Sequence, residues 1–214
     1  MENGYREINL GSWKRVRHLA LYERSAYPYV GVSANLEITH LLEICRARDL
    51  NFFSAFLFVA MQAMNRVENF RYRIADGGVR LYDRIDPSFT VFDPDDELFY
   101  FAYAPLCPKP ALFYQRVEEA KQSALREKCL SGNELDVVHI SCLPWFGFYD
   151  IIQPLTLDGG APSSVPKLMW GKFETAGGKT TIPFSVTAHH GLVDGFHIGR
   201  LFAAIDECTE LLKN

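Results

Sequence analysis

The stretch Ser185–Arg200 reads SVTAHHGLVDGFHIGR, and its pattern combines a strand, a polar turn and a helix. It continues an apolar, β-branched run that begins at Ile182, and the helical pattern of apolar residues that follows it extends to Leu212. The polar groups concentrate in the turn, which is where folds commonly place chemistry. Within this turn, His190 and Asp194 form an H-x-x-x-D-G motif.

The adjacent His189 and His190 and the nearby Asp194 allow three interpretations. In the first, Asp194 caps the following helix and the histidines are hydrogen-bonded residues at a strand end. A metal site is disfavoured, because adjacent histidines on a strand point to opposite faces and no third ligand stands at a diagnostic spacing. In the third, one histidine is a general base, since imidazole accepts and returns a proton near neutral pH. The residues alone leave the first and third open.

Nucleophilic catalysis has weaker support. Cys142 is a candidate thiol nucleophile, but it follows Ser141 on an apolar strand, which is typical of a buried structural cysteine. No G-x-S-x-G motif is present, so a hydrolase triad is not expected.

The composition, 48% hydrophobic and 22% charged with a net charge of −4, predicts a folded protein and no nucleic-acid partner. Five cysteines without C-x-x-C spacing and a polar N-terminus favour a reducing, cytoplasmic setting. The longest apolar run, Phe52–Met64, is shorter than the ~20 residues that a membrane helix requires, so no membrane partner is expected. The many aromatic residues suit a pocket or an interface.

Strand and helix patterns alternate along the chain. They predict that residues 1–214 form a single α/β domain, a two-layer sandwich with a mixed, largely antiparallel sheet and packed helices. Ser12 is expected to cap a helix over residues 13–23, which places Arg15 in its first turn. The helix dipole disfavours a cation there, so an anionic partner is expected for Arg15. Residues 146–152 are expected to form another strand.

The segment His189–His197, HHGLVDGFH, resembles the active-site signature of chloramphenicol acetyltransferases. The H-x-x-x-D-G motif alone is less specific, because dihydrolipoyl acyltransferase cores share it. The resemblance covers most of the chain, and it implies a coenzyme A-dependent acyltransferase fold and acetyl transfer from acetyl-coenzyme A to a hydroxyl of chloramphenicol. Further stretches fall in the family's order: Ser12-Trp13-Lys14-Arg15, Asn69-Phe70-Arg71, Thr90-Val91-Phe92, Ser141-x-x-Pro144-Trp145 and Gly171-Lys172-Phe173.

The resemblance implies specific catalytic roles and no metal. His190 matches the general base, which takes a proton from the acceptor hydroxyl as this hydroxyl attacks the thioester directly. Ser141 matches the donor to the tetrahedral oxyanion, a contribution worth roughly 3–4 kcal/mol of barrier. Asp194 matches the aspartate that pairs with the arginine at Arg15.

Binding residues and assembly follow from the same resemblance. Trp145, Lys172 and Phe173 fall on family positions around the coenzyme A channel, where Lys172 is a plausible phosphate contact. Tyr22 and Phe99 match aromatic residues of the acceptor pocket. The family forms trimers with active sites between subunits, so a homotrimer is expected here.

The sequence departs from the family at four positions. Met169 stands in place of a threonine, Asn51 in place of a lysine near the coenzyme A phosphate, and Pro28 and Val30 in place of a cysteine and an aromatic residue of the acceptor pocket. The sequence therefore does not specify which small molecule accepts the acetyl group. The alternatives are the same chemistry on a different small hydroxylated acceptor, or a trimeric binding protein without turnover.

Overall fold

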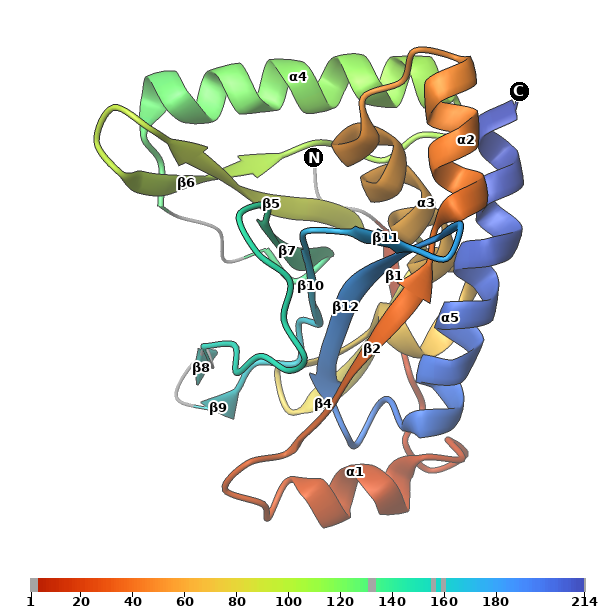
Figure 1. Ribbon diagram of the computed structural model, residues 1–214. Coiled ribbons are helices and arrows are strands. Elements are labelled where there is room, and N and C mark those ends of the chain that lie inside the picture. Colours follow the sequence, from red (N-terminus) through yellow and green to blue (C-terminus); the bar gives the residue numbers. More distant parts are fainter. Residues whose placement is uncertain (1–3, 131–133, 155–156, 159–160, 214) are drawn as a thin grey trace.

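The computed structural model of the protein describes residues 4–130, 134–154, 157–158 and 161–213. Helices α2, α3 and α5 lie together on one side of a large mixed sheet (Figure 1). The helices are α1 (Val16–Tyr22), α2 (Thr39–Ala47), α3 (Phe52–Arg66), α4 (Pro110–Glu127) and α5 (Gly195–Thr209), with 3-10 turns over Glu68–Arg71 and Glu210–Lys213. The large sheet contains β2 (Tyr29–Glu37), β5 (Asp86–Asp93), β6 (Leu98–Tyr103), β7 (Val137–Leu143), β10 (Lys167–Gly171), β11 (Glu174–Ala176) and β12 (Lys179–His189). Smaller sheets contain β1 (Tyr5–Glu7), β3 (Tyr72–Ala75) and β4 (Gly78–Tyr82), and β8 (Leu157–Asp158) with β9 (Ala161–Pro162).

β12 organises the large sheet because it pairs with three other strands. It is antiparallel to β2, β10 and β11, and β5 and β6 form an antiparallel hairpin. β7 is parallel to both β10 and β5 and joins the antiparallel parts. This register places Met169 of β10 between Ser141 of β7 and Ser185 of β12. The mixed, largely antiparallel sheet with packed helices that the sequence predicted is confirmed.

α3 accounts for the long apolar run in the sequence. It contacts α2, α4 and α5, so apolar residues are needed around its circumference rather than along one stripe. Phe56, Phe58 and Met61 are fully buried. The Asn51 side chain caps the helix by accepting a hydrogen bond from the Ser54 amide at 3.1 Å. In the described part of the chain, no helix is both long enough and apolar enough to cross a membrane.

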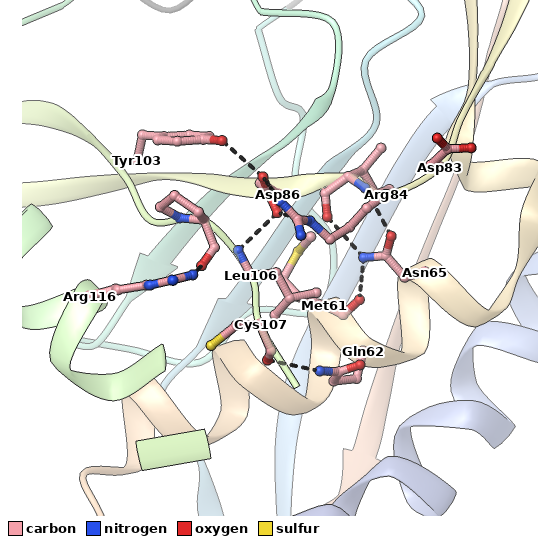
Figure 2. Close-up of polar contacts among 12 residues, drawn as sticks. Met61, Gln62, Asn65, Asp83, Arg84, Asp86, Tyr103, Leu106, Cys107 and Arg116 are labelled. Atoms are coloured by element: carbon pink, nitrogen blue, oxygen red, sulfur yellow. Dashed lines mark hydrogen bonds and ion pairs between the residues drawn. The ribbon is translucent and has the colours of Figure 1, made fainter. Parts of the chain in front are cut away.

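Figure 2 shows how the buried carboxylate of Asp86 holds the start of β5. Arg84 Nε, Tyr103 Oη and the Leu106 amide each donate a hydrogen bond of 2.9 Å to it. Asn65 of α3 binds both the amide and the carbonyl of the residue before Asp86, at 2.9 Å each. A buried charge is costly unless it is paired and hydrogen-bonded, and these contacts meet that condition. They fix β5 against α3 before β5 reaches the candidate site.

The first helix begins later than predicted. α1 starts at Val16, and Arg15 is its N-cap residue with φ −96° and ψ 5° rather than a member of its first turn. Ser12 does not cap this helix, because its hydroxyl and amide both donate to the Asn9 carbonyl in a preceding turn. Such local side chain–backbone bonds compete with helix formation, which makes the prediction of a helix over residues 13–23 wrong at its start.

No strand forms over residues 146–152, contrary to the prediction. The segment packs against the end of β10, where the Phe146 carbonyl accepts a hydrogen bond from the Lys172 amide at 3.0 Å. Gly171 permits this close approach, because a Cβ atom there would lie 2.9 Å from Pro183 Cγ and 3.0 Å from the Phe146 carbonyl oxygen. The aromatic pattern of the segment therefore reflects contacts across a strand end rather than strand pairing.

Candidate active site

The turn between β12 and α5 holds His190 in a defined orientation. The His190 amide donates to the Pro28 carbonyl at 2.7 Å, and the ring stacks on Tyr22 with ring centroids 4.2 Å apart. His190 Nδ1 lies 3.0 Å from the Val193 carbonyl oxygen. Because a carbonyl only accepts, Nδ1 carries the proton in the neutral ring and Nε2 keeps its lone pair. This tautomer is the one that a general base acting through Nε2 requires.

Arg15 and Asn69 hold the turn through its carbonyl groups. Arg15 donates from Nη2 to the His190 carbonyl and from Nε to the Gly191 carbonyl, both at 3.2 Å. Asn69 Nδ2 donates to the Leu192 carbonyl at 2.8 Å. Since His190 Nδ1 binds the next carbonyl, side chains bind four successive carbonyls of the turn. The position of His190 therefore depends on α1 and on the 3-10 turn after α3.

Asp194 connects the turn that Arg15 and Asn69 hold to α5. Arg15 Nη1 donates to Asp194 Oδ2 at 2.9 Å, which is the ion pair implied by the family resemblance. Asp194 Oδ1 accepts from the Phe196 amide at 3.1 Å, so Asp194 is also the N-cap of α5, and its own amide donates to His197 Nδ1. Burial acts to raise the pKa of Asp194, but the hydrogen bond from Arg15 and the nearby charges of His197 and Arg15 outweigh it and lower the pKa. Asp194 is thus an anion that orients the turn.

His189, the last residue of β12, is buried with 4% exposure. Its Nδ1 accepts a hydrogen bond from the Gly191 amide at 3.2 Å. Burial, together with the charge of His190, lowers the pKa of His189 to about 4. His189 is therefore neutral near pH 7 and is engaged in holding the turn. Among the residues that the structure describes, no three His, Cys, Asp or Glu side chains form a group that could hold a metal ion.

Ser141 lies on the wall of a cavity of about 730 Å³ that is bordered by the start of α3 and by β5, β6, β7 and β10. Ser141 Oγ is 3.3 Å from Thr90 Oγ1 of β5, and Met169 is its register neighbour on β10. Either hydroxyl can act as the donor in this pair. A hydrogen bond donated by Thr90 leaves the Ser141 proton available to a group in the cavity.

The cavity wall is mainly aromatic and aliphatic, and it carries the positive charges of Lys121 and Lys172. At its rim the ring of Phe173 packs on that of Phe52, with centroids 5.3 Å apart. The aromatic surface and the two cations suit a ligand that is partly apolar and partly anionic. The residues predicted from the sequence that line this cavity are Phe99, Ser141, Trp145, Lys172 and Phe173.

Cys142 also lines the cavity. Burial raises the pKa of its thiol to about 11, so it is a neutral thiol near pH 7. A catalytic cysteine needs a lowered pKa, because the thiolate is the nucleophile. The structure therefore favours the structural interpretation of this cysteine.

Ser141 and His190 of one chain lie in different parts of the sheet. Ser141 is level with Met169 and Ser185 in the sheet, and His190 lies five residues beyond Ser185, past the end of β12 in the following turn. At a rise of about 3.3 Å per residue, this separation is on the order of 15 Å. Proton transfer and oxyanion binding need contacts of about 3 Å. The described wall of the cavity accordingly does not include Arg15, Tyr22, His190 or Asp194.

Comparison with known proteins identifies the family. The model of the chloramphenicol acetyltransferase family matches residues 3–206. The chain belongs to this family. Chloramphenicol acetyltransferase 2 of Haemophilus influenzae is 28% identical over 216 residues, covering 98% of this chain and 99% of that protein. The chloramphenicol acetyltransferase of Clostridium perfringens is 26% identical over 211 residues, covering 97% of this chain and 94% of that protein.

Solved structures show the fold that this family membership predicts. A structure of a chloramphenicol acetyltransferase matches with a TM-score of 0.82 at 22% identity, covering 96% of this chain and 99% of that chain. A probable dihydrolipoamide acetyltransferase from Listeria monocytogenes matches with a TM-score of 0.65 at 14% identity, covering 96% of this chain and 93% of that chain. The protein is thus an acyltransferase-family enzyme of the chloramphenicol acetyltransferase type.

The four departures from the chloramphenicol acetyltransferase pattern lie on both parts of the candidate site. Pro28 is buried and precedes β2, and its carbonyl accepts the hydrogen bond from the His190 amide. Val30 lies near the start of β2. Met169 lines the cavity, whereas Asn51 is engaged as the cap of α3 and is not part of the described wall.

Three residues of the site had no role assigned from the sequence: Asn69, Thr90 and Lys121. Asn69 and Thr90 belong to stretches that resemble the chloramphenicol acetyltransferase family, so their place in those stretches was a usable signal. Lys121 lies on an ordinary amphipathic helix, and nothing in its neighbourhood along the chain distinguished it from a solvated lysine.

Proposed function

We propose that the protein is an acetyl-coenzyme A-dependent O-acetyltransferase that acetylates a hydroxyl of chloramphenicol and so inactivates the antibiotic. The observation that carries this proposal is the tautomer of His190. Its Nδ1 is bound to the Val193 carbonyl, which leaves Nε2 as the proton acceptor in a turn held by Arg15 and Asn69. Membership of the chloramphenicol acetyltransferase family supports the acetyl-transfer chemistry.

In the proposed reaction, His190 Nε2 takes the proton of the acceptor hydroxyl while the hydroxyl oxygen attacks the thioester carbonyl of acetyl-coenzyme A. The proton then passes from Nε2 to the departing sulfur, so the imidazole ends neutral and no acyl-enzyme forms. The imidazolium is stabilised by its stacking on Tyr22 and by the retained bond from Nδ1 to the Val193 carbonyl. A general base of this kind typically contributes 10²–10⁴-fold in rate.

Ser141 is the proposed donor to the oxyanion that forms during attack. The nearby Thr90 hydroxyl, at 3.3 Å, orients the Ser141 hydroxyl by donating to its oxygen, so that the Ser141 proton points to the reacting carbonyl. A preorganised donor acts most strongly on a charge that develops in the transition state, and its loss typically costs roughly 3–4 kcal/mol of barrier.

Acetyl-coenzyme A fits the cavity beside Ser141. A volume of about 730 Å³ with an aromatic and aliphatic wall suits the pantetheine arm and the adenine. Trp145 and Phe173 are the proposed apolar contacts of the cofactor, and Lys172 is the proposed phosphate contact.

The complete site is proposed to form between two copies of the chain in a homotrimer. The separation of His190 from Ser141, on the order of 15 Å from strand geometry, is too long for one copy to supply both groups. Phe99 and Trp145 are 51% and 55% exposed in the single chain, and exposed aromatic residues beside a cavity are typical of an interface. Tyr22 and Phe99 would then contact the acceptor from opposite subunits.

A second candidate function keeps this chemistry and changes the acceptor. It is supported by Pro28, Val30 and Met169, where the sequence departs from the family pattern. A binding protein without turnover is disfavoured, since such a protein has no need of His190, Ser141, Asp194 and Arg15 together. None of the five cysteines, all of which lie in the described part of the chain, forms a disulfide, which supports the proposed cytoplasmic location.

A thiol-release assay tests the proposal. The protein is incubated with acetyl-coenzyme A with and without chloramphenicol, with a chloramphenicol analogue in which the primary hydroxyl is removed, and with a panel of other small alcohols. Thiol release that requires chloramphenicol and its hydroxyl, and that disappears in His190→Ala, is the expected result. Release with other alcohols alone favours the second candidate. A protein that binds acetyl-coenzyme A and transfers to no acceptor contradicts both.

A further inference from the structure

Lys121 of α4 is a cation on the wall of the Ser141 cavity. Its side chain is 24% exposed, and its Nζ lies 4.6 Å from the centre of the Phe53 ring. Phe53 belongs to the first turn of α3 and lines the same cavity. The ammonium group is therefore held over an aromatic surface inside the cavity, whereas most helix lysines extend into solvent.

The local ion pair of Lys121 does not explain this position. Glu118 lies one turn earlier on α4, and its Oε2 is 3.7 Å from Lys121 Nζ. Glu118 is 60% exposed, and exposed pairs of this type contribute little. Among the described lining residues, Lys121 and Lys172 are positively charged and Glu97 is negatively charged. The wall of the cavity therefore has a net positive charge. The cavity therefore attracts an anionic group.

Two consecutive aromatic residues at the start of α3 contact Lys121 and the neighbour of Lys172. Phe52 packs on Phe173, which is next to the exposed Lys172, and the following residue, Phe53, packs on Lys121. Asn51, which precedes both aromatic residues, is uncharged and is engaged as the helix cap. Lys121 of α4 and Lys172, which follows β10, both line the cavity that begins at the start of α3.

We propose that Lys121 binds a phosphate group of coenzyme A, as a second cation beside Lys172; this inference rests on the proposed function. Coenzyme A combines an apolar pantetheine arm with a pyrophosphate and a 3′-phosphate. The cavity offers the matching combination of an apolar wall and two ammonium groups. Because the Lys121 side chain is only partly exposed and Lys172 is exposed, salt screens the contribution of Lys121 less.

Isothermal titration calorimetry with free coenzyme A measures this contribution without any acceptor. Lys121→Met keeps the apolar stem over Phe53 and removes the charge, and it should raise Kd about three- to tenfold, as expected for one partly exposed charge contact. Lys121→Arg should restore most of the affinity. Lys109→Met, at the exposed start of the same helix, is the matched control and should leave Kd unchanged.

Shortened ligands identify the phosphate. If dephospho-coenzyme A, which lacks the 3′-phosphate, binds equally well to wild type and Lys121→Met, then Lys121 contacts the 3′-phosphate. A loss that persists with this ligand and vanishes with pantetheine assigns the pyrophosphate. An unchanged Kd for coenzyme A in Lys121→Met, or an equal loss with pantetheine, overturns the inference while the proposed function stands. Failure of the wild-type protein to bind coenzyme A at all overturns the proposed function and this inference with it.

Discussion

Mixing two inactive variants tests whether the active site forms between copies of the chain. His190→Ala removes the proposed base and Ser141→Ala removes the proposed oxyanion donor, and each variant alone should lose at least about 10²-fold in rate. Strand register separates the two groups of one chain by roughly 15 Å, about five times the reach of proton transfer. If the proposed roles hold, an intact site needs His190 from one chain and Ser141 from its neighbour.

The expected recovery follows from counting neighbours in a ring. In a trimer with two chains of one variant and one of the other, a single site combines an intact base with an intact serine, so about one third of the wild-type rate should return. The variants carry different affinity tags, are co-expressed and purified through both tags, and are assayed by thiol release. His190→Ala mixed with His190→Gln is the control, because no site then has a base. Doubly tagged trimers that are no more active than this control refute the shared site.

Three further predictions concern the turn itself. In the thiol-release assay, His190→Ala should lower kcat at least about 10²-fold. His189→Asn keeps an acceptor for the Gly191 amide, so its kcat should stay within about tenfold of the wild-type value. Equal losses in two folded variants would contradict the assignment of the base. Arg15→Met and Asp194→Asn should show a coupling of about 1–3 kcal/mol in a double-mutant cycle of denaturant unfolding, and additive effects would mean that the ion pair contributes nothing. Folding lowers the pKa of His189 from its usual 6.5 to about 4, so His189 binds a proton at a higher pH in the unfolded chain than in the folded one. The free energy of unfolding should therefore fall as the pH drops from 6.5 to 4. That loss should be about 3 kcal/mol at pH 4 and should disappear in His189→Asn; a wild-type stability that stays flat over this range would contradict it.

The sequence predicted the strand–turn–helix at the end of the chain well, because its patterns are local. The capping interpretation of Asp194 is confirmed by the hydrogen bond from the Phe196 amide to Oδ1. The cap uses one carboxylate oxygen and leaves Oδ2 for Arg15, so the cap and the ion pair are compatible. The role of His190 as base stays a proposal that fits the same geometry.

The contacts that the sequence did not reveal join distant parts of the chain. Asn69 is 123 residues from the Leu192 carbonyl that it binds, and Lys121 packs on Phe53 of another helix. Neither pairing has a spacing that a periodic pattern reveals. The start of the first helix was missed for a local reason, since Ser12 forms a turn with Asn9 instead of capping.

The construction of the turn explains how the catalytic residues can match the family while the acceptor side departs from it. Arg15, Asn69 and His190 Nδ1 bind carbonyl oxygens of the turn, so they fix its backbone and the tautomer of the base. Pro28 binds the His190 amide through its carbonyl, a group that any residue at that position supplies. In the proposed mechanism, substitutions such as Val30 and Met169 leave these contacts with the turn unchanged, because neither side chain takes part in them. We therefore expect variants at Val30 or Met169 to alter the choice of acceptor while the contact between His190 Nδ1 and the Val193 carbonyl stays in place.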